Sequence, residues 1–519
     1  MADHGKEVMP PSAGAETALG RVSLIISRVV TVEAGQSAEQ FRTDDAVKIG
    51  SSRRRAIIVL ILLANLLQFV SMFSTVIGGF DFSSKLGQDI GPGQANWMAA
   101  AYSLTQSTFV LISGRLGSVY GHQRLLLLGV VIIAIFSLVN AFCTTYTSFV
   151  AMRAITGIGG GILMPNAVAT LTLMIPPGKA RNFTLAVFAA SPPLGAMTGA
   201  LLAGAFLQYS AWKYFFVLVA CLGAVTVAGL VFVLPREEPQ DRGGKIDYVG
   251  IFLGLAGLLL FNISWNQSTS LGWQSASVIA MLVVSFVLLV AFFFWESRWA
   301  AEPIMPPSLF KTSNLKALTV VVLSIYMSVG ILLWYMVAWQ QLVRKWDTLH
   351  VALGWIPYGV GASIAVLLAA ALIPIMEAKF LLAMGCVALI IATVLMATMP
   401  AQQIYRAQVF PATFISSFCA DFVYVAAQVI VSNSVSKRDQ GPAGSLIGTL
   451  NLYGNSLGLG FAGTIEVQVV KHTLNEVTGF RAALWFGFGL AVLSLVLSLT
   501  FVKIPRDRRE GWDEDVETI

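Results

Sequence analysis

Long apolar stretches, separated by short polar gaps, run along the chain from about residue 56 to about residue 503. Nearly all of them reach the roughly 20 residues that a helix needs to cross the hydrocarbon core of a bilayer. Because backbone N–H and C=O groups must be paired inside a membrane, such stretches are expected to be α-helices. The sequence therefore predicts an all-α integral membrane protein with fourteen transmembrane helices. The expected spans are 56–80, 96–114, 125–142, 149–175, 184–207, 214–234, 248–266, 276–296, 317–342, 350–372, 380–399, 408–433, 444–466 and 482–502.

The polar gaps divide these spans into groups of six, two and six. Six spans precede the polar segment 235–245, two follow it, and an amphipathic linker at 296–316 leads to the last six. Two six-helix bundles around a central cavity are typical of secondary transporters. We therefore expect a disordered cytoplasmic tail at 1–50, a six-helix bundle at 51–235, a cytoplasmic loop with two extra transmembrane helices at 236–300, a second bundle at 301–505 and a cytoplasmic tail at 506–519.

Basic residues are distributed unevenly between alternate gaps. With a cytoplasmic N-terminus, clusters such as Arg53–Arg55 and Lys437–Arg438 fall inside, whereas the outer gaps hold scattered residues such as Lys85 and Lys213. An excess of Lys and Arg in short loops marks the cytoplasmic side. The pattern predicts an even number of spans and two cytoplasmic termini. We expect the plasma membrane as location, with the vacuole or another endomembrane as the alternative.

Composition supports a membrane protein and argues against other classes. The chain is 56% hydrophobic and 12% charged, with a mean hydropathy of +0.76, whereas a soluble domain carries about 25% charged residues. Its net charge of +6 does not indicate nucleic-acid binding, because the basic residues cluster beside the spans. The sequence contains no phosphate-binding Gly-x-x-x-x-Gly-Lys-[Ser/Thr] loop and no His-Glu-x-x-His pair. We expect no enzymatic activity, no catalytic residues, no cofactor and no metal, and a chain that works as a monomer in the lipid bilayer.

Three of the charged residues within the spans or at their edges are candidates for binding a proton or a substrate. A charge inside a membrane costs roughly 2.5–3.5 kcal/mol on insertion scales and often lines a cavity. Asp421 is the most interior carboxylate, and burial favours its neutral form, so we expect it to bind a proton reversibly. A neutral Asp bonded to a neighbouring helix is the alternative. Arg153 is expected to hold an anionic substrate group or to tune a carboxylate, unless it pairs structurally or snorkels outward, and Glu466 is a weaker proton-site candidate.

A polar stripe surrounds the interior carboxylate. Ser417, Asp421, Tyr424 and Gln428 follow i, i+4, i+7, i+11 spacing, so they share one helix face. We expect this face to line the central cavity. Each of the other candidates is also consistent with a simple helix–helix hydrogen bond; they are Gln68, Ser71, Thr75, Tyr102, Gln106, Thr156, Asn451 and Asn455, with the aromatic residues Trp334, Tyr335 and Trp339.

Glycine and proline are concentrated inside several spans. The expected fifth span contains Pro193, Gly195 and Gly199. Small residues let helices approach closely, and proline interrupts the helical hydrogen bonds. We interpret this segment either as a helix that bends during function or as ordinary tight packing.

The gap between the second and third spans reads GRLGSVYGHQR from Gly114 to Arg124. It resembles the loop motif G-x-L-x-D-x-x-G-R-[RK]-x of the major facilitator superfamily. The resemblance implies a cytoplasmic gate formed by Gly114, Arg115, Ser118, Gly121 and Arg124. Ser118 stands where the motif has Asp, and a serine caps a helix without supplying a charge.

Further segments carry the same resemblance. Arg153 to Gly159 is similar to the superfamily pattern R-x-x-Q-G-x-G, with Thr156 in place of Gln, and the fifth span loosely resembles the antiporter motif G-P-x-x-G-G. With fourteen spans, the chain resembles the larger drug:proton antiporter branch of this superfamily. Segments 247–267 and 421–466 resemble the fungal aminotriazole-resistance and low-affinity ammonium-facilitator group. The resemblance implies the major facilitator fold, with two pseudo-symmetric six-helix bundles.

Together these patterns predict a secondary active transporter. We expect proton-coupled efflux of a small organic molecule, such as a drug, toxin or secondary metabolite, by alternating access between the two bundles. A facilitator of a small inorganic solute such as ammonium or borate is the alternative. It is favoured by Ser118 and by the first span, where Met72–Thr75 lacks the carboxylate that this branch often has. A non-transporting membrane sensor is a third interpretation.

Overall fold

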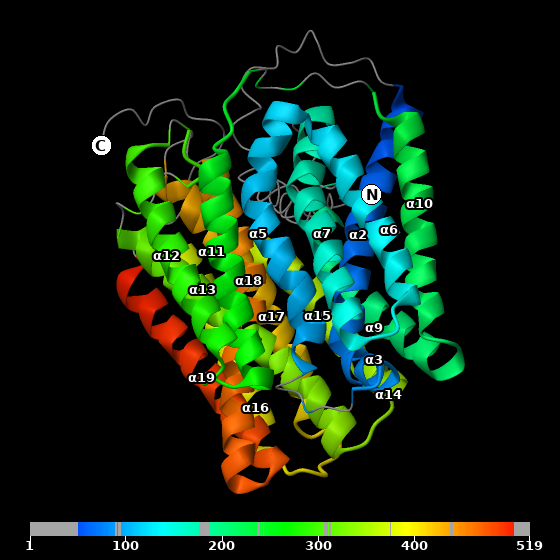
Figure 1. Cartoon of the computed structure of the whole chain (residues 1–519), viewed down its shortest axis with the longest axis vertical. Helices are drawn as coiled ribbons and strands as arrows, with labels where there is room; N and C mark the ends of the chain where they lie inside the picture. The colour runs from blue at the N-terminus through cyan, green and yellow to red at the C-terminus, as the bar shows by residue number, and fades with distance from the viewer. Residues whose placement is uncertain are drawn as a thin grey trace, which may run out of the picture.

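The computed structural model describes residues 50–88, 91, 95–175, 184, 187–235, 239, 241, 243–300, 302–305, 310, 313–373, 375–435 and 440–502. Residues 1–49 of the expected tail at 1–50, the expected tail at 506–519 and the basic pair Lys437–Arg438 lie outside these residues. Within the described part the regular elements are helices (Figure 1): α2 (Ser51–Ile77), α3 (Gly79–Lys85), α5 (Trp97–Tyr120), α6 (His122–Phe142), α7 (Tyr146–Met174), α9 (Ser191–Tyr209), α10 (Lys213–Val233), α11 (Tyr248–Leu271), α12 (Ala276–Arg298), α13 (Ser313–Ala338), the π-helix η2 (Trp339–Val343), α14 (Thr348–Leu353), α15 (Ile356–Leu372), α16 (Ala378–Thr398), α17 (Val409–Ser434), α18 (Gln440–Thr473) and α19 (Glu476–Phe501).

Eleven segments of the described chain are helical, long and apolar enough to cross a membrane. The prediction of an all-helical, multi-pass membrane protein is therefore confirmed. The three other expected spans coincide with α5, α9 and α18, which do not reach the same apolarity. All three lie at the interior seam described below, where contact with protein instead of lipid permits more polar and small residues. The count of fourteen spans stays a prediction.

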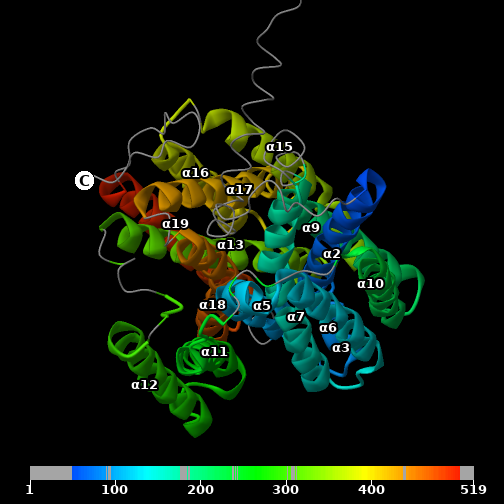
Figure 2. The ribbon, with the colours of Figure 1, turned by 90° about the horizontal axis from the view of Figure 1, so that it is seen from above.

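The helices form two sets with the same internal pairing. In the first set, α2 to α10, the pairs are α6–α7, α5–α7, α2–α9, α6–α10 and α2–α10. In the second set, α13 to α19, the corresponding pairs are α16–α17, α15–α17, α13–α18, α16–α19 and α13–α19. We call these sets the first and second halves. In the view from above they gather on opposite sides of the molecule (Figure 2).

The seam between the halves is formed by a few helices. Helix α5 packs on α18, and α9 packs on α14 and α15. These contacts place α5 and α18 at the centre of the molecule (Figure 2). A cavity described below lies along this seam.

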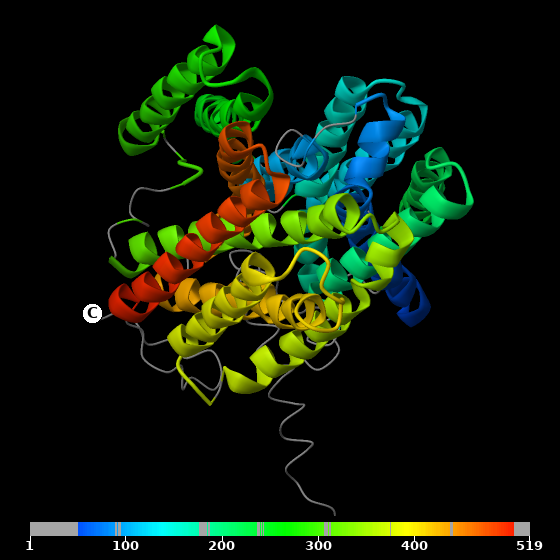
Figure 3. The same ribbon diagram turned by 90° about the horizontal axis from the view of Figure 1, so that it is seen from below.

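A helical hairpin, α11 and α12, lies beside the two halves. Helix α11 packs on α18 and α5, while α12 packs on α11 at the outer edge (Figures 2 and 3). Polar contacts attach α11 to α18: Ser456 Oγ donates to Asn262 Oδ1 at 3.0 Å, and Asn266 Nδ2 donates to the Ser456 carbonyl at 3.4 Å. The ring of Trp265 stacks on Phe461 with a centroid separation of 3.7 Å. The contacts of Asn262 and Asn266 therefore join helices away from the seam.

Glycines bring two equivalent helix pairs into backbone contact. A Cβ on Gly195 of α9 would lie 2.4 Å from Phe69 Cβ of α2, and one on Gly199 would lie 2.5 Å from the Val70 carbonyl oxygen. In the second half, a Cβ on Gly458 of α18 would lie 2.4 Å from the Met327 carbonyl oxygen of α13. Pro193 falls in the first turn of α9, which is earlier in its helix than the expected span 184–207 implied. These glycines serve close packing, and bending of α9 stays a prediction.

We expect Gly458→Ala to destabilise the protein, because a Cβ at that position must displace the backbone of α13. Overpacking of this kind costs about 1–3 kcal/mol. Thermal unfolding of the purified protein should show a lower midpoint for Gly458→Ala. The matched control is Gly489→Ala on α19, which meets no atom within 4 Å and should leave the midpoint unchanged. Equal midpoints for the two variants would contradict the close packing of α13 and α18.

Candidate functional site

A cavity of about 200 Å³ lies between the two halves. Helices α2, α5, α7 and α9 line it from the first half, and α13, α15, α17 and α18 line it from the second. Most of its wall is apolar and aromatic, with residues such as Phe69, Met72, Phe73, Leu333 and Trp334. A largely apolar cavity with a few polar groups is the usual form of a small-molecule site.

The polar wall of the cavity contains one charged residue among those that the structure describes. That residue is Asp421 on α17. The neighbouring Tyr326 hydroxyl donates to the Ala420 carbonyl at 2.7 Å, while Asp421 Oδ2 is buried and accepts no hydrogen bond from a described residue. The remaining polar residues of the wall are Asn65, Ser103, Tyr326, Tyr358, Tyr424, Asn451 and Asn455.

The polar stripe of α17 reaches the cavity only at its centre. Asp421 and Tyr424 line the wall, but Ser417 lies against Gly361 of α15 and donates to the Phe414 carbonyl at 2.7 Å. Gln428 donates to the Gly444 carbonyl of α18 at 3.3 Å. The four residues share one face, but α15 and α18 cover its two ends. Ser417 and Gln428 are therefore interhelical contacts in this structure.

Arg153 does not line the cavity. It is fully buried on α7 and donates to the hydroxyl and carbonyl oxygens of Ser71, both at 2.7 Å, and to Thr75 Oγ1 at 3.4 Å. Its guanidinium lies 4.7 Å from the centre of the Tyr102 ring. These contacts fix α7 against α2 and α5, which is the structural alternative foreseen for this arginine. Ser71, Thr75 and Tyr102 are the partners in these contacts, and none of the three is part of the cavity wall.

Two predicted glutamines form a buried chain of amides instead of cavity wall. Gln106 Nε2 donates to Gln68 Oε1 at 3.3 Å, and Gln68 donates to Asn65 Oδ1. Asn65, which sequence reasoning missed, lines the cavity and donates to the Phe188 carbonyl at 3.3 Å. The sequence feature that could have identified Asn65 is its position one turn before Gln68 on an otherwise apolar helix. Thr156 is turned onto its own helix and donates to the Met152 carbonyl at 2.8 Å.

On α18, Asn451 and Asn455 line the cavity as predicted. Asn455 Nδ2 donates to the Asn451 carbonyl at 2.8 Å, so part of its amide is used within the helix. Glu466, further along α18, is buried outside the cavity wall and accepts a hydrogen bond from the Tyr335 hydroxyl at 2.8 Å. Of the three predicted aromatic residues only Trp334 lines the cavity; Tyr335 contacts Glu466, and Trp339 donates to the Ala401 carbonyl at 3.3 Å.

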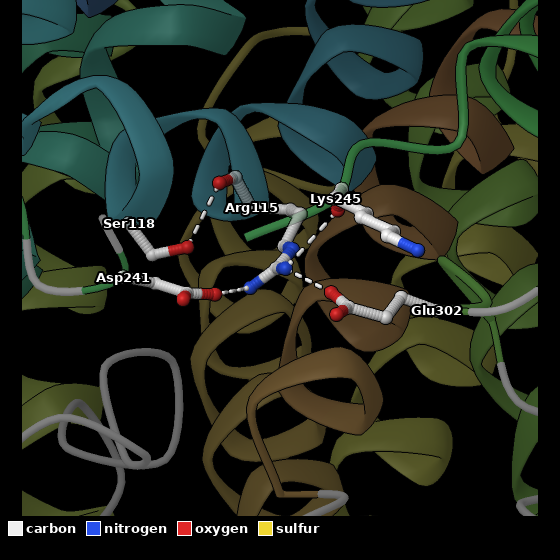
Figure 4. A network of polar contacts seen from close by, with 5 residues as sticks. All are labelled: Arg115, Ser118, Asp241, Lys245 and Glu302. Carbon is white, nitrogen blue, oxygen red and sulfur yellow. Dashed lines mark hydrogen bonds and ion pairs between the residues drawn. The ribbon is translucent and has the colours of Figure 1, made fainter. Parts of the chain in front are cut away.

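The turn between α5 and α6 carries the loop motif, and Arg115 is its centre (Figure 4). Arg115 donates to Asp241 Oδ2 at 2.7 Å, to the Lys245 carbonyl at 3.1 Å and to Glu302. Ser118 Oγ donates to the Arg115 carbonyl at 2.8 Å, and the Asp241 amide donates to the Ser118 carbonyl at 3.0 Å. Asp241 precedes the α11–α12 hairpin and Glu302 follows it. The segments flanking the hairpin thus supply carboxylates to a motif in which Ser118 carries none.

Glycine shapes the same turn. Gly121 has a φ of +104°, which favours glycine, and it separates α5 from α6. A Cβ on Gly117 would lie 1.9 Å from Asn166 Oδ1 and would disrupt the contact between His122 Nδ1 and Asn166 Oδ1 at 2.8 Å. Gly114 faces open space, and Arg124 is exposed.

A second group of contacts joins the halves at the opposite end of the bundle, near α3 and α14 (Figure 1). Asp81 accepts from Thr348 Oγ1, and Gln341 Nε2 donates to the Ile77 carbonyl at 2.9 Å. The Phe80 ring stacks on Trp334 with a centroid separation of 4.7 Å, and Trp334 itself lines the cavity. These contacts join the two halves beside the cavity residue Trp334. Sequence reasoning missed Asp81, although it is the first charged residue after the first apolar stretch.

Comparison with known proteins decides the family. The sequence profile of the Major Facilitator Superfamily matches residues 64–459. The chain belongs to this superfamily.

Two curated relatives and one solved structure place the chain within the Major Facilitator Superfamily. The low affinity ammonium transporter of Saccharomyces cerevisiae is 32% identical over 421 residues, covering 79% of this chain and 81% of that protein. The efflux pump terG of Aspergillus terreus is 32% identical over 467 residues, covering 85% and 86%. A crystal structure of a POT family transporter in complex with 5-aminolevulinic acid has the same fold, with a TM-score of 0.63, 13% identity and coverage of 86% and 96%.

Membership of the Major Facilitator Superfamily settles several predictions. The protein is a multi-pass membrane transporter and not an enzyme. The resemblance to the ammonium-facilitator and drug-transporter groups is confirmed.

Replacement of Arg153 should reduce stability, because Arg153→Met leaves the Ser71 carbonyl and hydroxyl without their buried charged partner. Hydrogen bonds to charged groups contribute about 1.5–3 kcal/mol each, so the unfolding midpoint should fall by about 3 °C or more. Arg406→Met, at an exposed arginine, is the control and should unfold like the wild type. An unchanged unfolding midpoint for Arg153→Met, combined with weaker substrate binding, would indicate that Arg153 takes part in substrate binding.

Proposed function

We propose that this protein is a proton-coupled exporter of a small organic molecule, working by alternating access. The observation that carries the proposal is the cavity between the two halves, where Asp421 is the one carboxylate among the described residues of the wall. A site at the interface of two helical bundles becomes accessible to each side of the membrane in turn when the bundles rock. The similarity to an efflux pump supports export as the direction.

The proposed topology has fourteen spans, counting α5, α9 and α18 with the eleven more apolar segments. Both termini are cytoplasmic, so the α5–α6 turn faces the cytoplasm and the α3–α14 end faces outward. The excess of basic residues in the gaps assigned to the cytoplasm supports this orientation. Residues 51–235 and 301–505 form the two moving bundles of a monomer in the plasma membrane.

Asp421 is the proposed coupling residue. An ionised carboxylate in a mostly apolar cavity lacks the hydration it would have in water, so a proton or a ligand group must compensate its charge. When the cavity opens outward, proton binding to Asp421 releases the substrate. When it opens inward, proton loss restores the charge for the next substrate molecule. Glu466 is bonded to Tyr335 outside the cavity wall, so we place it behind Asp421 as a proton-site candidate.

A facilitator of ammonium or borate is the second candidate. The similarity to a low affinity ammonium transporter favours it, and so does the missing carboxylate in the first span, at Met72–Thr75. A facilitator moves its solute without an imposed proton gradient, so transport assays separate the two functions.

Asp421→Asn should abolish gradient-driven efflux. The amide keeps the size of the side chain but cannot gain or lose a proton near neutral pH. In proteoliposomes tested with a panel of compounds, a pH gradient should accelerate wild-type transport, whereas Asp421→Asn should retain less than about a tenth of that acceleration. Glu377→Gln, at an acidic residue paired with Lys379 outside the cavity, should behave like the wild type.

Two outcomes would count against proton coupling at Asp421. Gradient-driven transport that survives in Asp421→Asn places the coupling group elsewhere. Ammonium or borate movement that ignores the gradient and the substitution indicates the facilitator.

The Arg115 contacts form a proposed latch at the cytoplasmic gate. The three side chains are about a third to a half exposed, so the ion pairs contribute little to stability, about 0–1 kcal/mol each. Their proposed role is to hold α5 to the segments that flank the α11–α12 hairpin in one conformation of the transport cycle.

Reversal of a charge in this latch should slow transport without unfolding the protein. We expect Arg115→Asp and Asp241→Arg each to reduce the transport rate severalfold, with unfolding midpoints within about 1 °C of the wild type. The double variant should recover at least about half of the rate, because the ion pair is restored with its partners exchanged. Lys379→Asp breaks the 2.7 Å pair with Glu377 and is the control. Single variants that transport normally would exclude a gating role for the pair.

A further inference from the structure

The cavity has a negative electrostatic bias. Asp421 is the only charged residue among the described residues of its wall, and no described Lys, Arg or His lines it. The buried arginine of the first half, Arg153, is bonded to Ser71 and Thr75 outside the wall. An anionic ligand would therefore be repelled by Asp421 with no described cation in the wall to offset the repulsion.

The carboxylate is also incompletely satisfied. Asp421 Oδ2 is buried without a hydrogen-bond partner among the described residues. Tyr326 lines the same wall, but its hydroxyl already donates a hydrogen bond to the Ala420 carbonyl. A buried charged oxygen without a partner is costly, and the cost is removed by a proton or by a cation. The geometry thus leaves a position that either species can occupy.

Aromatic side chains from three helices line the same cavity. Tyr326 of α13, Tyr358 of α15 and Tyr424 of α17 all line the cavity with Asp421. Asp421 interacts electrostatically with Tyr326 and with Tyr358. The faces of aromatic rings attract organic cations, and aromatic side chains are the usual partners of quaternary ammonium groups. A carboxylate beside several tyrosines is a suitable environment for a substituted ammonium ion.

The rest of the wall defines the body of the ligand. It is formed by apolar side chains, among them Met72, Val329, Leu333 and Val366. The cavity volume of about 200 Å³ exceeds the roughly 150 Å³ of an engineered apolar cavity that binds benzene. One aromatic ring with a small ammonium group is therefore of suitable size.

We propose that the cavity binds an organic cation, with the charged nitrogen against Asp421 among Tyr326, Tyr358 and Tyr424 and the apolar body against the remaining wall. The proposal rests on the transport function assigned to this cavity and names its substrate class. A proton and the cation then compete for one carboxylate, so binding of either one displaces the other.

Competition predicts the direction of the pH dependence. The titratable groups that face Asp421 are Tyr326 on α13, Tyr358 on α15, and Cys419 and Tyr424 on α17. None of them is cationic, and the polar side chains that α18 contributes to the described wall are the neutral amides of Asn451 and Asn455. Protonation of Asp421 therefore removes the one negative charge of the described wall. Cation binding should weaken as the pH falls, whereas binding of a neutral ligand of the same shape should not.

The test is a binding measurement on the full chain in lipid nanodiscs, without any gradient. The probes are benzyltrimethylammonium, its neutral carbon isostere neopentylbenzene and the anion phenylmethanesulfonate, with choline and 3,3-dimethylbutanol as a second matched pair. Titration calorimetry, corrected with empty nanodiscs, should show each cation binding at least about tenfold more tightly than its isostere at pH 8. The preference should shrink at pH 5.5, and the anion should bind most weakly.

Variants assign the preference to individual residues. Asp421→Asn should abolish the cation preference, whereas Asp421→Glu should retain part of it. Tyr358→Phe keeps the ring and should bind like the wild type, and Tyr358→Leu should weaken cation binding severalfold. Unfolding midpoints show which variants are folded. If Asp421→Asn does not fold, the comparison of Tyr358→Phe with Tyr358→Leu tests the inference.

The outcomes separate this inference from the proposed transport mechanism. Cations that bind no more tightly than their neutral isosteres, or do not bind at all, overturn the inference. A preference that persists in folded Asp421→Asn also overturns it. A cation preference without gradient-driven transport would retain the inference and reject proton coupling, whereas gradient-driven export of a neutral compound without a cation preference would do the reverse.

Discussion

The absence of water from the bilayer is the constraint on which this structure depends. Every backbone group of a spanning segment must find its partner within the protein, which explains why the described elements are helices. The same constraint sorts side chains by position. Helix α12 faces outward, and only 11% of its apolar 18-residue stretch is buried inside the protein. In α7, 78% of the corresponding stretch is buried. Polar and charged side chains such as Arg153 are accordingly found on the inner helices, where other protein groups replace water as partners.

This sorting determines what the sequence could predict. Hydropathy alone located nearly every helix to within a few residues, because contact with lipid tolerates few polar side chains over some 20 positions. The least apolar helices, α5, α9 and α18, are also those at the seam, and there hydropathy is weakest as a signal. The interior carboxylate Asp421 was predicted to line the cavity, and it does, since a charge at that depth must face an interior space.

The positions of the remaining site residues could not be predicted from the sequence of a single helix. A periodic stripe identifies a face but not the length of it that neighbouring helices cover, so Ser417 and Gln428 were assigned to the wall with Asp421 and Tyr424. Arg153 and Ser71 are distant in the sequence, and only the packing of α7 on α2 shows that both terminal nitrogens of the arginine already donate hydrogen bonds. Likewise, the partners of Arg115 come from segments beyond α10 and beyond α12, and no local motif signals them.

The attachment of the α11–α12 hairpin has a mechanical consequence. The buried amides of Asn262 and Asn266 and the stacked rings of Trp265 and Phe461 attach α11 to α18 of the second half. On the side of the first half, α11 packs on α5, and partly exposed ion pairs connect the segments at the two ends of the hairpin to Arg115. In the proposed alternating access the halves rotate against each other, and the partly exposed ion pairs of Arg115 are the connection expected to break first. The hairpin is then expected to move with the second half, so that a rotation within the membrane makes or breaks its contacts with Arg115 at one surface of the protein.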